Sequence, residues 1–175
     1  MDSKERTFRV SMGKAAKRLT AAYFAVLLIV FGASYVSGVY DKPTPLSLSL
    51  NGSVAAILAV TTLWCYWLSP KRLDVNGEWL TIERRIGRKR IAIRDIILIE
   101  RYGGMGGDMR VCGVGGVFGF TGWFLGRQGK YFAYVGDCHD TVMVTTARRS
   151  YLVSCDSPDE LVTEVRKHIG GQAPD

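Results

Sequence analysis

Residues Leu19 to Tyr40 read LTAAYFAVLLIVFGASYVSGVY, a stretch without Asp, Glu, Lys or Arg. As an α-helix it would extend about 33 Å, which is enough to cross a hydrocarbon core of about 30 Å. A second uncharged stretch, Gly52 to Pro70, reads GSVAAILAVTTLWCYWLSP. Its end is rich in aromatic residues, as an interfacial belt is. Together they predict a transmembrane helical hairpin over residues 19–70, with spans at about 19–40 and 52–69.

The basic residues around these stretches predict the direction of the hairpin. Residues 1–18 hold six Lys or Arg against two acidic residues, and the connection between the spans holds only Lys42. Lys71 and Arg72 follow the second span. Because positive charge marks the cytoplasmic side, both termini are expected in the cytoplasm.

The expected organisation is therefore a multi-pass protein of a cytoplasmic (inner) membrane. It has a basic cytoplasmic N-terminal segment at 1–18, the hairpin at 19–70, a cytoplasmic domain at 71–170 and a tail at 171–175.

Two other interpretations of the apolar stretches stay open at this point. A cleaved signal peptide also has a basic start and an apolar centre, but here the apolar run is long and a second one follows. Two buried core helices of a soluble protein are the other alternative, which 22 consecutive uncharged residues disfavour.

Composition excludes several function classes. The net charge is +7, which would suit nucleic-acid binding, but the largest basic excess adjoins the first apolar stretch and favours a membrane, so no nucleic-acid partner is expected. The four cysteines show no C-x-x-C spacing. Thiols of a cytoplasmic domain normally stay reduced, so no disulfide framework is predicted.

After Leu73 the pattern changes to short alternating runs that are typical of strands. Gly87 lies between two of them and predicts a hairpin. Residues 94–102 are ambiguous and would suit a turn followed by a strand. The strands expected here and further along the chain cover residues 78–85, 89–93, 130–135, 141–146 and 150–154.

The C-terminal part carries signals for one amphipathic helix. Ser157 and Glu160 have the spacing of a capping box, and Pro158 suits the first helical position. Gly170 is a C-terminal stop signal. The apolar residues that fall on one helical face are Leu161, Val162, Val165 and Ile169. The helix is expected to pack this face on a sheet.

The run RVCGVGGVFGFTGWFLGRQGKYFAYVGD, followed by TVMVTTARRSYLVSCDSPDELVTEV, resembles the bacterial pleckstrin-homology-like (PH-like) domain of small membrane proteins. The likeness covers roughly residues 70–170, and two preceding transmembrane segments also fit. It implies an α+β fold, in which an antiparallel β barrel or sandwich is capped by the C-terminal helix. It implies no catalytic activity and supplies no ligand, because fold is not function.

The glycine-rich stretch from Val111 to Leu125 permits three interpretations. Its glycines lack the spacing of a dinucleotide fingerprint and a Walker ending, which disfavours nucleotide binding. They are typical of bulges and close backbone approach in curved strands. The stretch is also uncharged and could touch the bilayer interface, the helical hairpin or a partner. The partner-contact candidates are Phe118, Phe120, Trp123 and Phe124.

Five cations surround the turn at Gly87, and they form the candidate lipid-surface site. They are Arg84, Arg85, Arg88, Lys89 and Arg90. Near an anionic leaflet each cation contributes on the order of 1 kcal/mol of attraction. The alternative is a solvated edge hairpin whose charges discourage pairing with another strand.

The triplet Cys138-His139-Asp140 suggests catalysis or metal binding at first sight. Neighbours in a strand point to opposite faces, and the only other histidine, His168, lies in the predicted helix. Metal ligation needs three or four converging donors. We therefore expect no catalytic residue, no metal and no cofactor.

These features favour a membrane-anchored, non-catalytic interaction module that binds a protein partner or the anionic membrane surface. A structural or regulatory subunit of a membrane complex, with a homo-oligomeric hairpin, is the first alternative. A membrane-associated enzyme is the second, and a concave pocket with converging titratable groups would favour it.

Overall fold

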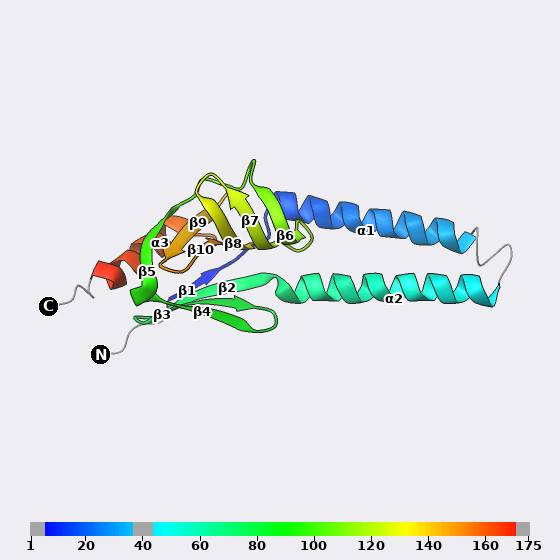
Figure 1. Ribbon diagram of the computed structural model, residues 1–175, viewed down its shortest axis with the longest axis horizontal. Coiled ribbons are helices and arrows are strands. Elements are labelled where there is room, and N and C mark those ends of the chain that lie inside the picture. Colours follow the sequence, from blue (N-terminus) through cyan, green and yellow to red (C-terminus); the bar gives the residue numbers. More distant parts are fainter. Residues whose placement is uncertain (1–5, 37–43, 171–175) are drawn as a thin grey trace.

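The computed structural model describes residues 6–36 and 44–170. Two helices run side by side away from a β-rich domain that also holds the first and last elements of the chain (Figure 1). Several predicted features lie outside the described residues. These are the first five residues of the basic segment, the span end at 37–40, Lys42 in the connection and the tail at 171–175.

Helices α1, Lys14–Ser34, and α2, Pro45–Leu68, have 21 and 24 residues, and the most apolar 18-residue window of each has a mean hydropathy of 1.6. They are about 32 and 36 Å long and are long and apolar enough to cross a membrane. In the most apolar window of α1 6% of the residues are buried, and in that of α2 none of them is. The described part of the chain therefore does not cover them as it would cover core helices.

Both helices begin earlier than the sequence predicts. α1 takes in the basic residues from Lys14 onward, which were expected to precede the span. α2 begins at Pro45 because Thr44 and Ser47 form a reciprocal capping box. Pro45 acts as a start signal rather than a turn signal, since the first helical position needs no N–H donor.

A short strand before α1 pairs with the strand that follows α2. β1, Arg6–Arg9, runs antiparallel to β2, Pro70–Val75, with Arg6 opposite Val75 and Arg9 opposite Arg72. The helical hairpin is thus the connection between two neighbouring strands. The sequence did not predict β1, because Phe8 is the one apolar residue in this strand and the alternation is too short to recognise.

β1 and β2 belong to a four-stranded sheet in the order β1-β2-β3-β4, with β3 at Trp79–Arg84 and β4 at Arg88–Ala92. β3 and β4 form the predicted hairpin, with Trp79 opposite Ala92. Gly87 has a φ of +79°, which explains glycine at this turn. We call this sheet A.

The remaining strands form a six-stranded sheet B in the order β5-β9-β10-β8-β7-β6. The chain enters it from a 3₁₀ turn, η2, Ile93–Asp95. The strands are β5, Ile96–Arg101; β6, Met109–Gly115; β7, Phe120–Gly126; β8, Gly129–Val135; β9, Thr141–Thr146; and β10, Ser150–Ser154. The turn-then-strand expected at 94–102 is confirmed.

The α+β class and the sandwich are confirmed, but two details of the expected sheet differ. The described strands form two packed sheets rather than a closed barrel. β10 also lies between β8 and β9 and pairs with β8 in parallel. The link Gly136–Asp140 therefore spans one strand position and is not a hairpin turn, although its composition is turn-like.

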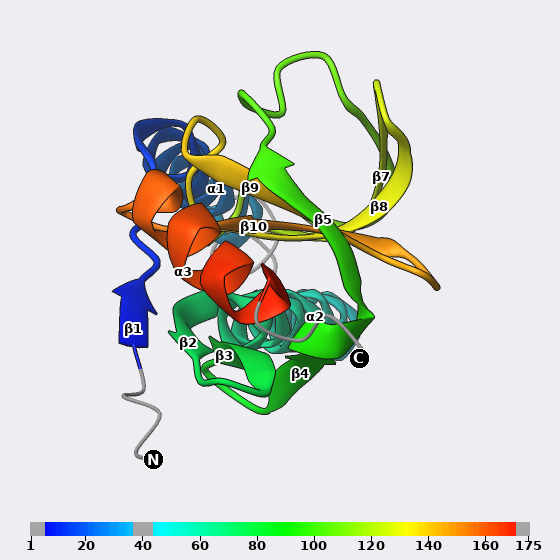
Figure 2. The same ribbon diagram turned by 90° about the vertical axis from the view of Figure 1, so that its left-hand side faces the viewer.

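Helix α3, Pro158–Gly170, lies alongside the two sheets and is seen end to end in Figure 2. Its Leu161 and Val165 are fully buried, and the predicted apolar face packs into one cluster with Phe8 and Leu80 of sheet A and Val144 of sheet B. β1 therefore contributes to the main core of the domain through Phe8.

Phe8→Ala is expected to lower the free energy of unfolding by about 3–5 kcal/mol, because it removes a buried ring from that cluster. The measurement is urea unfolding of the full chain in detergent micelles, followed by tryptophan fluorescence. Arg9→Ala, at an exposed position of the same strand, is the control and should change stability by less than about 0.5 kcal/mol. Equal stability of the two variants would show that β1 is not part of the core.

Candidate functional site

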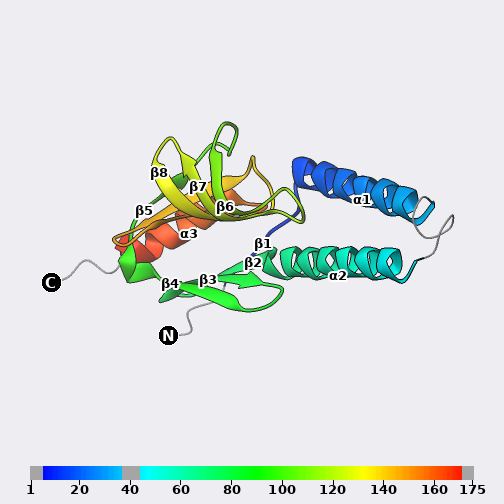
Figure 3. The same cartoon turned by 45° about the vertical axis from the view of Figure 1, so that its right-hand side comes forward.

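Two hairpin tips of the domain lie against the ends of the helices. The β3–β4 tip, residues 85–87, and the β6–β7 tip, residues 116–119, both point toward α1 and α2 (Figure 3). We call this region the helix–domain junction. It contains the predicted lipid-surface cations at one tip and the first of the predicted aromatic residues at the other.

Phe118 lies between the two helices. Its ring contacts Phe24 of α1 at 6.2 Å and Tyr66 of α2 at 5.3 Å between ring centroids, both edge to face. Its N–H donates to Oγ1 of Thr20 at 3.0 Å, and its carbonyl accepts from Oγ of Ser69 at 2.7 Å. The predicted partner-contact residue Phe118 is thus held by the chain's own helices.

The backbone at this tip is unusual. Phe118 has a φ of +59° and is the one non-glycine residue with a positive φ among residues 6–36 and 44–170. This conformation costs about 1–2 kcal/mol for an L-residue and persists where surrounding contacts fix it. At Gly116, also at positive φ, a Cβ atom would collide with Leu19 of α1. Gly116 therefore allows this tip to approach α1 closely.

The middle of the β6–β7 hairpin confirms the expectation of curved, closely approaching strands. Gly113 faces Gly122 across the pair, and a Cβ atom on either would collide with the backbone of the other strand. The register shifts between Arg110 and Cys112, which is a bulge in the edge strand.

The β3–β4 tip is bonded to the last turn of α2. The N–H of Ile86 donates to the carbonyl of Trp67 at 3.3 Å, and the Arg85 N–H donates to Ser69 at 3.4 Å. The Arg85 guanidinium lies 4.1 Å from the ring centroid of Tyr66. Ile86 itself is 56% exposed. An apolar side chain with a cation beside it therefore projects where the apolar helix ends.

The five candidate cations lie in different environments. Arg84 is half-buried and lies 5.9 Å from the ring of Tyr134. Burial raises the pKa of the Tyr134 hydroxyl, and the charge of Arg84 opposes that rise. Arg85 and Arg88 are exposed beside the tip, whereas Lys89 and Arg90 line a cleft on the flank of the domain.

The other three predicted aromatic residues belong to sheet B. Phe124 is buried and stacks on Tyr131 with centroids 6.1 Å apart. Phe120 is half-buried and packs against the same cluster. Trp123 is half-buried with the Lys130 ammonium 4.9 Å from its ring. Each therefore has a packing role within the sheet.

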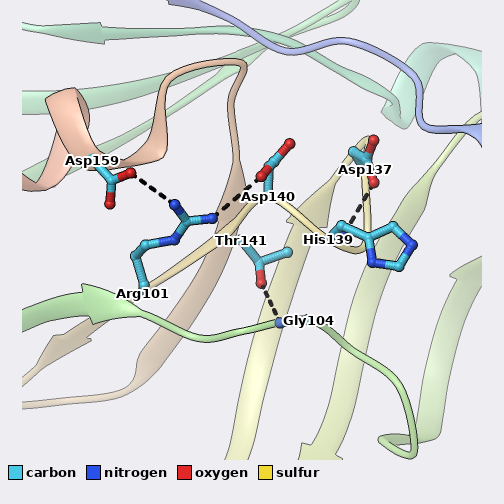
Figure 4. Close-up of polar contacts among 7 residues, drawn as sticks. All are labelled: Arg101, Gly104, Asp137, His139, Asp140, Thr141 and Asp159. Carbon is cyan, nitrogen blue, oxygen red and sulfur yellow. Dashed lines mark hydrogen bonds and ion pairs between the residues drawn. The ribbon is translucent and has the colours of Figure 1, made fainter.

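The residues of the triplet Cys138-His139-Asp140 have separate partners in the described residues. Asp140 pairs with Arg101, which also bonds Asp159 at 2.8 Å, and the His139 backbone N–H donates to Asp137 (Figure 4). Burial, with the nearby Asp137 charge, raises the pKa of the Cys138 thiol to about 11, so it stays protonated at neutral pH. No three His, Cys, Asp or Glu side chains of the described residues converge as a metal site would require.

Sequence reasoning missed the residues that join these parts. Thr20 and Ser69 hold the β6–β7 tip, yet polar residues near the ends of apolar spans are common and carry no distinguishing signal. Arg148 and Arg149, which form a basic pair in the β9–β10 turn, also escaped notice. Their adjacency was visible, but their proximity to β4 is a long-range contact.

Residues 71–169 match the family model described as the bacterial PH domain. The chain belongs to this family. The match begins within β2. β1 and the helical hairpin therefore precede the matched region, although β1 pairs with a strand of the bacterial PH domain. Neither the search of curated proteins nor that of solved structures finds a significant match. Bacterial PH domain membership suggests an interaction module, since PH-like domains are generally non-catalytic.

Thr20→Val is expected to accelerate amide exchange of residues 116–119 about fivefold, because it removes the acceptor of the Phe118 N–H and one hydrogen bond contributes on the order of 1 kcal/mol. The measurement is hydrogen–deuterium exchange of the full chain, resolved by peptide. Thr61→Val is the matched control, since the Thr61 hydroxyl bonds only carbonyls of its own helix. Unchanged exchange in Thr20→Val would contradict the described junction.

Proposed function

We propose that this protein is a membrane-anchored interaction module whose helices α1 and α2 cross the bilayer and whose PH domain rests on the cytoplasmic face. The exposed surface of both helices supports this, because large apolar side chains such as Leu28 and Ile57 are 76% and 62% exposed. A soluble chain seldom exposes apolar surface of this extent. α2 also follows a first span, unlike a signal sequence.

The pairing of β1 with β2 supports an arrangement in which the start of α1 and the end of α2 lie on one side of the bilayer. Because the two strands are neighbours, α1 must begin and α2 must end at the same side of the bilayer. Exposed cations gather at that side, among them Lys14, Lys17, Arg18 and Lys71. The positive-inside bias then favours a cytoplasmic domain with both termini in the cytoplasm.

The observation that carries the membrane-surface contact is the hydrogen bond from Ile86 to Trp67. If the aromatic end of α2 lies in the interfacial layer, a backbone bond fixes the β3–β4 tip at the same depth. Ile86 then enters the interface, and Arg85 and Arg88 lie at the level of the headgroups. Each cation would add about 1 kcal/mol of attraction to an anionic leaflet, and salt would weaken it.

The full chain is expected to stay in the membrane pellet after extraction with alkaline carbonate, because transfer of two apolar spans to water is unfavourable. Orientation is read separately at Cys112, an exposed thiol, with Cys112→Ser as the control. A membrane-impermeant maleimide should label Cys112 in inside-out vesicles and not in intact cells, and Cys112→Ser should lose this labelling. Release by carbonate, or labelling of intact cells, would refute the anchor or its direction.

The hairpin contact is tested with a polarity-sensitive fluorophore on Ile86→Cys in a Cys112→Ser background in nanodiscs, since Cys112 is an exposed thiol. Emission should shift to the blue when neutral phosphatidylcholine is replaced by a mixture with phosphatidylglycerol, and Arg85→Gln/Arg88→Gln should abolish the difference. Arg127→Gln/Lys130→Gln removes an equal charge at the β7–β8 turn, at the opposite end of β7 from the junction. This control variant should keep the difference in emission between the two lipid compositions. Identical spectra in the two lipids would exclude the contact.

A further inference from the structure

A cleft of about 330 Å³ opens on the flank of the domain, between the edge of sheet A and a turn of sheet B. One side is β4 with the η2 turn that follows it, and the other is the β9–β10 turn. In Figure 2 the η2 segment and the end of the β9–β10 hairpin lie on the same side of the molecule. The cleft exists because sheet A ends at β4, and no strand fills the space between the two layers.

The lining of this cleft is strongly cationic. Among the described residues that line it, Asp95 is the one acidic side chain, and the basic side chains are Lys89, Arg90, Arg94, Arg148 and Arg149. Trp79 and Tyr151 contribute aromatic walls, and Ile91 and Ala92 an apolar floor. Lys89 lies 5.9 Å from the Tyr151 ring and Arg149 5.9 Å from the Trp123 ring, so rings of the sheet help to position two of the cations.

Most of these cations have no acidic partner in the described residues. Of the five, Arg94 alone pairs with a carboxylate, that of its neighbour Asp95 at 3.9 Å, and both side chains of that pair are largely exposed. Some other cations of the domain are paired with carboxylates: Arg72 with Asp74 and Glu83, and Arg101 with Asp140 and Asp159. Repulsion among unpaired like charges is unfavourable until a counter-charge binds.

We propose that this flank cleft binds a compact polyanion that carries phosphate groups. A single carboxylate would leave most of the positive charge uncompensated, whereas a pyrophosphate or phosphomonoester brings two or more charges and several acceptor oxygens. Arginine guanidinium groups match phosphate oxygens in a bidentate geometry, and Arg90, Arg148 and Arg149 supply three of them. The aromatic and apolar walls make one side less hydrated, which strengthens the charge interactions.

The site is distinct from the membrane contact proposed above. The β3–β4 tip touches α2, whereas the cleft is lined by β4 from Lys89 to Ala92 and continues along the η2 turn, away from the tip. Arg85 and Arg88, which carry the membrane contact, do not line it. Binding of a soluble phosphate compound therefore does not depend on whether the tip reaches headgroups. The phosphate could belong to a soluble compound or to a lipid headgroup that reaches the flank.

Inorganic pyrophosphate is the probe, titrated calorimetrically into the full chain in neutral phosphatidylcholine nanodiscs at constant ionic strength. We expect saturable binding that weakens about tenfold or more in Arg148→Gln/Arg149→Gln, since this variant loses two charge-assisted contacts to the probe. Arg85→Gln/Arg88→Gln removes the same charge outside the cleft and should retain most of the affinity. Circular dichroism establishes that both variants are folded.

Two further arms identify the source of the phosphate. Pyrophosphate is titrated in nanodiscs that contain phosphatidic acid, a phosphomonoester lipid, and in nanodiscs with phosphatidylglycerol at equal surface charge. Weaker pyrophosphate binding in the first alone assigns the cleft to a headgroup, and equal binding in the two assigns it to a soluble compound. Absence of saturable binding in neutral nanodiscs, or equal loss in both charge variants, would overturn the proposal.

Discussion

The antiparallel pairing of β1 with β2 is the constraint on which the rest of the structure depends. It converts a pair of apolar helices into the loop of a β-hairpin, so that the helices begin and end at one place on the domain. Phe8 fixes this pairing to the core, because its ring packs with side chains of both sheets and of α3. The direction in which the two helices point therefore also fixes how sheet A is oriented, because β1 and β2 adjoin the helices.

The helix–domain junction adds a second connection that does not pass through β1 or β2. Phe118 contacts one aromatic residue from each helix, while its backbone bonds Thr20 and Ser69. The positive φ at Phe118 costs about 1–2 kcal/mol, and two hydrogen bonds plus ring packing are of the size needed to offset it. A change in the distance between α1 and α2 would thus displace the β6–β7 tip and, through this hairpin, alter sheet B.

The charges of the domain divide into two groups with different physical roles. Cations such as Arg72 and Arg101 bind carboxylates of neighbouring elements, which stabilises the fold modestly because these pairs are partly exposed. Those at the β3–β4 tip and in the flank cleft have few acidic neighbours. Such unpaired charges contribute little to folding and are available to an external anion, whether a leaflet or a small phosphate compound.

Features that depend on near neighbours can be read from the order of the amino acids. Two long uncharged stretches, the β3–β4 hairpin around Gly87 and the α3 face with Leu161 all follow from local periodicity and turn chemistry. The neighbours of each strand emerge only in the folded chain: β1 lies beside β2, β10 lies in parallel beside β8, and Arg149 lies across a cleft from β4. These contacts join residues far apart in the chain, and their geometry comes from the packing of two sheets, which no local pattern encodes.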